Sequence, residues 1–182
     1  DILCSNATFF GTGTNHDMYE NNGDGTFTEL SNEITAGTSA RGTVNWVDVD
    51  QDGDMDALTV SGAPGQRTIL WVNNGTDFDE VILIDSGEGV GRDSKSASFG
   101  DYDNDGDFDL YVANRGDNGD SNILFRNDGL DVNNLPVFTE VGSGAGDLVT
   151  DVDFSASSVW GDVDNDGDLD LFVGNDGGYP DY

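Results

Sequence analysis

The sequence is poor in basic residues: six lysines and arginines stand against 37 aspartates and glutamates, which gives a formal net charge of −31. Nucleic acids and anionic membrane surfaces carry the same sign of charge, so both are expected to repel this chain. We therefore expect no nucleic-acid partner and no membrane insertion. The same charge is expected to attract cations.

The chain also has little cysteine, histidine and proline, with one, one and three residues respectively. A single cysteine, Cys4, excludes a disulfide within the chain, and we interpret it as a small buried thiol in an apolar strand. His16 is interpreted as a surface or turn residue. No apolar run reaches the roughly 18 residues that a membrane-spanning helix needs. Because the chain begins at Asp1 rather than at a methionine, we expect a processed or excised piece.

What the chain does contain is enough apolar material for a core. Hydrophobic residues make up 35% of the sequence and aromatic residues 10%, which argues against disorder despite the charge. The tryptophans recur at strand positions and are assigned to core packing: Trp46, Trp71 and Trp160. The 26 glycines indicate many tight turns.

One acidic segment occurs three times, as DVDQDGDMD from residue 48, DYDNDGDFD from 101 and DVDNDGDLD from 162. A short apolar stretch follows each copy, and the chain itself opens with a similar stretch, DILCSN. Each copy is preceded by a small-residue strand that ends in an aromatic. The first two copies are followed by an aromatic-x-Asn-Asn/Asp-Gly hairpin signal, which also occurs at residue 19. Recurrence at this spacing indicates a repeat architecture.

Each unit is predicted to contain four short strands, near 97–100, 110–113, 122–126 and 137–141 in the middle copy. No stretch shows a helical period with caps, so the chain is predicted to be all-β. Such units are typical of four-stranded β-propeller blades, with a β-solenoid as the alternative. We treat 1–182 as a single repeat domain, an incomplete ring with repeats at approximately 1–38 (partial blade), 39–91, 92–150 and 151–182 (partial blade).

The aspartate segments are predicted to bind calcium between the first and second strands of each unit. Calcium takes roughly six to eight oxygen ligands, and glycine at the sixth position lets the chain curl so that alternate side chains converge. Each segment has nine residues, with aspartate at positions one, three, five, seven and nine, and each aspartate is named by its position. We assign the first, third, fifth and ninth as side-chain ligands and the seventh as the source of a backbone carbonyl. The candidate ligands of the three sites are Asp48, Asp50, Asp52, Asp54 and Asp56; Asp101, Asp103, Asp105, Asp107 and Asp109; and Asp162, Asp164, Asp166, Asp168 and Asp170.

Other readings of these loops fit the residues less well. An EF-hand needs a glutamate at position twelve of its loop, where this chain has Thr59, Val112 and Val173. Zinc is disfavoured because the loops contain no histidine or cysteine. A solvated acidic turn that binds nothing is the remaining alternative, and the threefold recurrence of the same Asp and Gly spacing argues against it.

The W/F-G-D-x-D-N-D-G-D-x-D-L core resembles the FG-GAP/VCBS repeats of extracellular proteins, including the calcium-binding blades of integrin α-subunit propellers. The resemblance covers nearly all of the chain and departs at Val47, where glycine usually follows the aromatic. It implies β-propeller blades with calcium in the loop between the first two strands. It also implies a secreted or cell-surface location and a role in adhesion or scaffolding.

We therefore expect an extracellular calcium-binding repeat protein with a structural or adhesive role, and not an enzyme. Open blade edges are expected to favour self-association into a polymer or filament, or contact with another extracellular protein or glycan. The alternative is a fragment of a larger propeller that serves as a ligand-binding (lectin-like) or enzyme-associated domain. Two Asn-x-Thr sequences match the N-glycosylation acceptor pattern, at Asn6 and Asn74.

Overall fold

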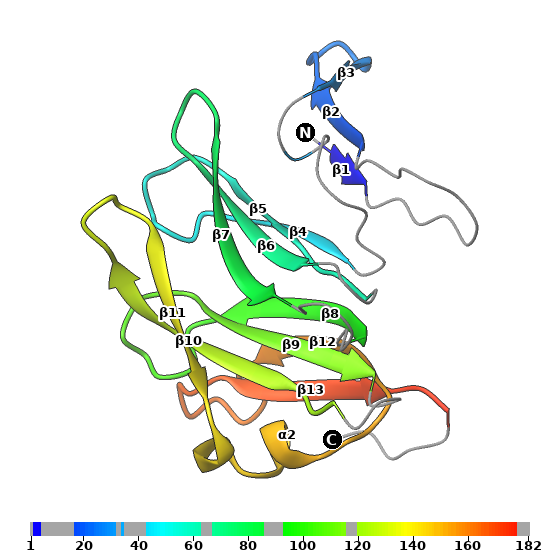
Figure 1. The fold of residues 1–182 in the computed structure, drawn as a ribbon, viewed down its shortest axis with the longest axis vertical. Helices are drawn as coiled ribbons and strands as arrows, with labels where there is room; N and C mark the ends of the chain where they lie inside the picture. The colour runs from blue at the N-terminus through cyan, green and yellow to red at the C-terminus, as the bar shows by residue number, and fades with distance from the viewer. Residues whose placement is uncertain are drawn as a thin grey trace.

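The computed structural model describes residues 2–4 (backbone only), 17–31, 34, 43–62, 67–85, 93–115 and 120–177. These residues form four antiparallel sheets that follow one another along the chain (Figure 1). The first sheet has three strands, β1 (Ile2–Cys4), β2 (Asp17–Asn21) and β3 (Phe27–Leu30). The second has β4 (Val44–Val47), β5 (Asp56–Thr59), β6 (Arg67–Asn73) and β7 (Phe78–Asp85). The third has β8 (Asp93–Gly100), β9 (Asp109–Arg115), β10 (Ile123–Leu130) and β11 (Pro136–Val141), and the fourth has β12 (Ser155–Gly161) and β13 (Asp170–Asn175).

The predicted all-β class is confirmed, and the two complete units are four-stranded meanders in which each strand pairs with the next. A short helical segment follows β11, with a 3-10 turn, η2 (Ser143–Ala145), and then a single helical turn, α2 (Asp147–Thr150). The sequence did not indicate this helix because one turn is too short to show a helical period.

The Asn-Asn/Asp-Gly signals form the turn between the last two strands of the first two sheets, and in the third sheet the signal forms an irregularity near the end of β10, just before the turn at 131–135. The glycine of each has a positive φ, 77° at Gly23, 81° at Gly75 and 85° at Gly129. The asparagine two residues earlier accepts the backbone N–H of this glycine at 2.9–3.1 Å. The hairpin prediction from these residues is therefore confirmed.

The two four-stranded sheets share an apolar core, the largest cluster of buried side chains among the described residues. Leu58 and Leu70 from the second sheet and Leu110 from the third are fully buried in it. Val47 is also buried there, so the core accommodates a larger side chain at the position where the family usually has glycine. Trp71 is buried in a neighbouring cluster that joins the first two sheets, in line with its predicted packing role.

The fourth sheet packs on the third through Trp160. The indole lies over Gly100, where an added Cβ would come within 2.7 Å of its Cγ atom. Its Nε1 donates to the carbonyl oxygen of Ser98 at 3.2 Å, and the ring stacks on Tyr102 with centroids 6.5 Å apart. The first strands of these units thus lie side by side, with β4 against β8 and β8 against β12.

No helix within the described residues is long and apolar enough to cross a membrane. Among the residues singled out from the sequence, Asn6 and His16 lie outside the described residues. The backbone of Cys4 lies in β1, as predicted, and its side chain is outside the description.

Candidate metal centres

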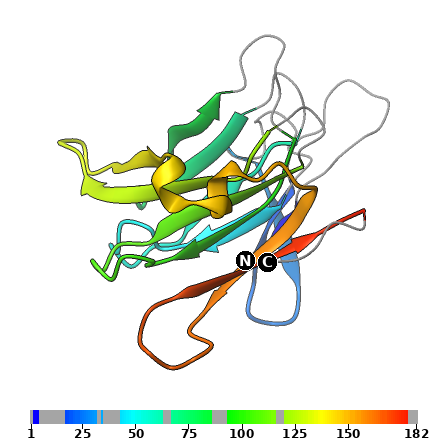
Figure 2. The same ribbon diagram turned by 90° about the horizontal axis from the view of Figure 1, so that it is seen from below.

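Each aspartate segment forms the connection between the first and second strands of its unit: β4–β5, β8–β9 and β12–β13. The three connections lie along one side of the molecule in Figure 1 and again in Figure 2. The sixth residue has φ of 98° at Gly53, 100° at Gly106 and 98° at Gly167, and an added Cβ at any of them would meet no atom within 4 Å. Glycine is therefore required there for backbone conformation and not for space.

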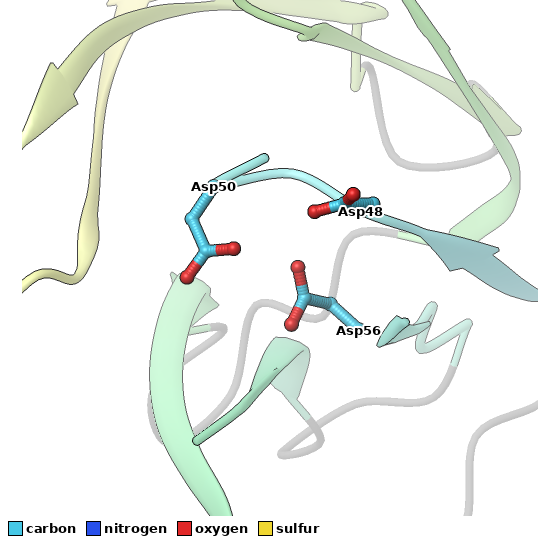
Figure 3. Close-up of side chains that lie close together, drawn as sticks. All are labelled: Asp48, Asp50 and Asp56. Atoms are coloured by element: carbon cyan, nitrogen blue, oxygen red, sulfur yellow. The ribbon is translucent and has the colours of Figure 1, made fainter. Parts of the chain in front are cut away.

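The carboxylates of the first, third and ninth aspartates converge in every loop. In each loop one oxygen from each of the three residues lies within 4.8 Å of the other two. Figure 3 shows the first loop, in which the three carboxylates face a common space. The three groups are Asp48, Asp50 and Asp56; Asp101, Asp103 and Asp109; and Asp162, Asp164 and Asp170. A set of oxygen donors only suits a hard divalent cation.

The fifth and seventh aspartates stand outside these groups. The carboxylate of the fifth residue accepts the backbone N–H of the seventh, at 2.9 Å in the first loop and 3.0 Å in the other two. This bond closes the turn around the glycine. A ligand role remains a prediction for the side chains of Asp52, Asp105 and Asp166, and for the carbonyls of Asp54, Asp107 and Asp168.

The ninth aspartate is held between two backbone donors in the complete units. Asp56 accepts the N–H of Val49 and the N–H of Asn73, both at 2.8 Å. Its counterpart Asp109 accepts the N–H of Tyr102 at 3.0 Å and that of Asn127 at 2.9 Å. Both aspartates are fully buried, so these bonds fix the orientation of the carboxylate.

Sequence analysis missed the anchoring role of the two asparagines, Asn73 and Asn127, because their place in the hairpin signal already explained them. Each also donates its side-chain amide to the carbonyl oxygen of the residue before the ninth aspartate, at 3.4 Å to Met55 and 3.3 Å to Phe108. The recurrence of asparagine 17 or 18 residues after that aspartate was the available signal.

The third loop has the same backbone conformation as the first two, but its carboxylates are more exposed to solvent. Its three converging aspartates are exposed, whereas Asp56 and Asp109 are fully buried. Asp170 accepts the N–H of Val163 at 3.0 Å. Within the described residues β13 pairs only with β12, so no third strand supplies the second backbone donor there.

Burial sets the electrostatics of the first two loops. It raises the pKa of Asp56 to about 6, an effect that the two backbone N–H donors oppose and that the charges of Asp50 and Asp52 reinforce. Burial likewise raises the pKa of Asp109 to about 6 and is the main cause of a raised pKa at Asp50. The raised pKa values indicate that no nearby positive charge among the described residues compensates the ionised form of these carboxylates.

The first loop also contains an unpartnered polar atom that a cation would satisfy. Oδ1 of Asp48 is buried and has no hydrogen-bond partner among the described residues. A buried oxygen without a donor costs free energy, more so when it carries charge. A cation between Asp48, Asp50 and Asp56 would compensate both this oxygen and the neighbouring charges, so the residues present fit a bound metal ion.

The second glycosylation candidate, Asn74, lies exposed in the β6–β7 turn. Its Nδ2 donates to Oδ2 of Asp79 at 3.0 Å, and its Oδ1 accepts the N–H of Thr76 at 3.2 Å. The side chain is thus part of the turn, and its modification remains a prediction.

Fold and loops together define a class of protein: antiparallel β units in series, with a carboxylate loop between the first two strands of a unit. The sequence matches the family model described as FG-GAP-like repeat over residues 1–59 and 101–173, which is more than half of the chain. The chain belongs to the FG-GAP-like repeat family, and the matched segments contain all three aspartate loops. The resemblance seen in the sequence is confirmed, while a comparison with curated proteins finds no match.

Proposed function

We propose that this chain is an extracellular calcium-binding repeat module with a structural or adhesive role rather than a catalytic one. The observation that carries the proposal is the convergence of three carboxylates in each of three equivalent loops. Calcium takes roughly six to eight oxygen ligands. The first, third and ninth aspartates would hold the ion, with the fifth carboxylate, the seventh carbonyl and water completing the shell.

The donor chemistry favours calcium over other common ions. Zinc prefers nitrogen and sulfur ligands, and the three clusters contain carboxylates alone. Magnesium demands near-ideal octahedral geometry and keeps several of its waters, whereas calcium accepts irregular coordination from a curled loop. Loops of this composition are therefore assigned to calcium.

Bound calcium would act mainly on stability. An ion that binds only the folded chain adds about 1.4 kcal/mol per site at tenfold excess over Kd. Calcium sites of extracellular modules have Kd values of about 10⁻⁴–10⁻³ M, so they fill in millimolar calcium. FG-GAP repeats are typically extracellular, which supports this location for the chain.

We further propose self-association or contact with another extracellular protein or glycan through the fourth sheet. The outer edge of β13 has no partner strand among the described residues, and an open edge favours pairing with another chain. Val159 and Phe172 on the same sheet are 59% and 55% exposed. This combination of an open edge and apolar side chains supports an interaction surface.

Calorimetric titration of metal-free protein tests the calcium proposal. Three calcium ions per chain are expected, and Asp50→Asn, Asp103→Asn and Asp164→Asn should each remove one. Glu29→Gln removes the same charge from an exposed position in β3 and should leave all three sites. Absence of calcium binding to the unaltered chain would overturn the proposal.

Sedimentation velocity in millimolar calcium and in excess chelator tests the association surface separately. Larger species are expected in calcium, and replacing Phe172 by serine should reduce them. A single small species under both conditions would reject self-association and leave the calcium sites in place.

A further inference from the structure

The loops of adjacent units are joined by hydrogen bonds from the fourth residue of one loop to the sixth or seventh residue of the next. Nε2 of Gln51 donates to the carbonyl oxygen of Gly106 at 2.7 Å and lies 3.3 Å from Oδ1 of Asp107. Nδ2 of Asn104 donates to Oδ1 of Asp168 at 2.8 Å. The same contact thus occurs at both junctions between consecutive loops.

The fourth residue lies at the centre of each curled segment, between the third and fifth aspartates. Its φ is 60° at Gln51, 59° at Asn104 and 62° at Asn165. Most residues other than glycine pay roughly 1–2 kcal/mol for this left-handed conformation, and asparagine adopts it more readily than glutamine does. Because the backbone conformation sets the direction in which the side chain leaves the chain, the amide reaches the next loop only while its own loop keeps this curled shape.

The third loop provides an internal comparison. Asn165 has the same backbone conformation as Asn104, and its side chain has no hydrogen-bond partner among the described residues. Both are asparagines in exposed turns of identical spacing, so they differ mainly in the contact to a following loop.

We propose that these amides couple the metal loops, so that ion binding in one loop strengthens binding in the loop that it contacts. The inference rests on the proposed calcium function. A cation among Asp101, Asp103 and Asp109 would fix the curl around Asn104, whose amide holds the seventh residue of the third loop, Asp168. The first ion thus orders part of the neighbouring loop. The second ion then loses less conformational entropy when it binds there, which produces positive cooperativity.

The test compares Asn104→Gly with Asn165→Gly. Glycine keeps the left-handed φ in both variants and removes the amide, so changes in chain flexibility are matched. Titration of the unaltered chain with calcium should give a Hill coefficient above unity. Asn104→Gly should lower this coefficient and weaken binding at the second and third loops about two- to tenfold, the effect of losing one hydrogen bond. Asn165→Gly should behave as the unaltered chain does.

A second pair of variants tests the same contact by charge, and a metal-free measurement tests it independently of calcium loading. Asn104→Asp and Asn165→Asp each add one negative charge, but only the former places it against Asp168, and its binding defect should be larger. In chelator, amide hydrogen exchange across residues 162–168 should be faster in Asn104→Gly than in the unaltered chain.

The outcomes distinguish a failure of the coupling between loops from a failure of the calcium proposal. Calcium binding that is equal in the Asn104 and Asn165 variants, with unchanged exchange, would overturn the coupling and leave the calcium proposal standing. If the unaltered chain binds no calcium, the proposed function fails and the coupling fails with it.

Discussion

At the scale of single residues, the ninth aspartates of the first two loops, Asp56 and Asp109, make the stability of the fold depend on pH. Burial raises the pKa values of Asp56 and Asp109 to about 6, whereas a carboxyl in the unfolded chain titrates near 3.8. Between these values the folded, metal-free protein binds more protons than the unfolded chain. These two groups therefore stabilise the fold fully below pH about 4, and this contribution is lost as the pH rises through about 6.

We expect the melting temperature in chelator to fall as the pH rises from about 5 to about 7, and calcium to raise it most at the upper end, where the ion replaces the lost protons. Asp24, Asp128 and Asp131 have pKa values lowered by hydrogen bonds that their carboxylates accept, so their titration lies below this window. Thermal denaturation followed by circular dichroism measures the effect. Asp109→Asn should flatten the dependence in chelator, and a melting temperature that rises over this range would contradict the argument.

At the scale of elements, the contact between first strands holds consecutive units together, and Gly100 is its tightest point. A Cβ on Gly100 would lie 2.7 Å from Cγ of Trp160, an atom of a rigid ring that is held by Ser98 and Tyr102. We expect Gly100→Ala to lower the free energy of unfolding by about 1–3 kcal/mol through overpacking.

Gly161 is the matched control for this prediction. It occupies the equivalent position at the end of β12, and an added Cβ would meet no atom within 4 Å. Neither glycine has a positive φ, so backbone strain does not distinguish the two alanine variants. Urea denaturation in chelator should show a loss for Gly100→Ala and little change for Gly161→Ala. Equal effects of the two substitutions would show that the indole contact does not govern stability.

The sequence predicted the strands, the turns and part of the carboxylate clusters, but not the contacts between distant positions. Local patterns foresaw the strands and turns, because the φ required at Gly106 or Gly129 depends on neighbours a few residues away. The carboxylate cluster followed from spacing for the first, third and ninth positions. The bond from Asn127 to Asp109 and the bond from Asn104 to Asp168 join positions 18 and 64 residues apart. Strand pairing and unit packing create such contacts, so the pattern within one loop does not specify them, and only the recurrence of asparagine between units pointed to the first.

At the scale of the whole molecule, the net charge of −31 opposes folding, because like charges repel more strongly in the compact state. The contacts described here concentrate that charge further, with three loops on one side of the molecule and hydrogen bonds between neighbouring loops. Dissolved salt screens such repulsion over a Debye length of about 10 Å at 0.1 M. An ion held among three carboxylates acts at closer range and only on the folded chain.

A triple variant with Asp50, Asp103 and Asp164 replaced by asparagine distinguishes charge repulsion from ion binding, because the two effects change its melting temperature in opposite directions. Removing three negative charges relieves repulsion, so in chelator the variant should melt at a higher temperature than the unaltered chain. In millimolar calcium the order should reverse, because the variant loses a ligand from each cluster and with it the stabilisation that bound ions provide. Sodium chloride at matched ionic strength should raise both melting temperatures without reversing their order. If calcium and sodium chloride act alike on both proteins, the loops behave as a diffuse acidic surface rather than as three ion sites.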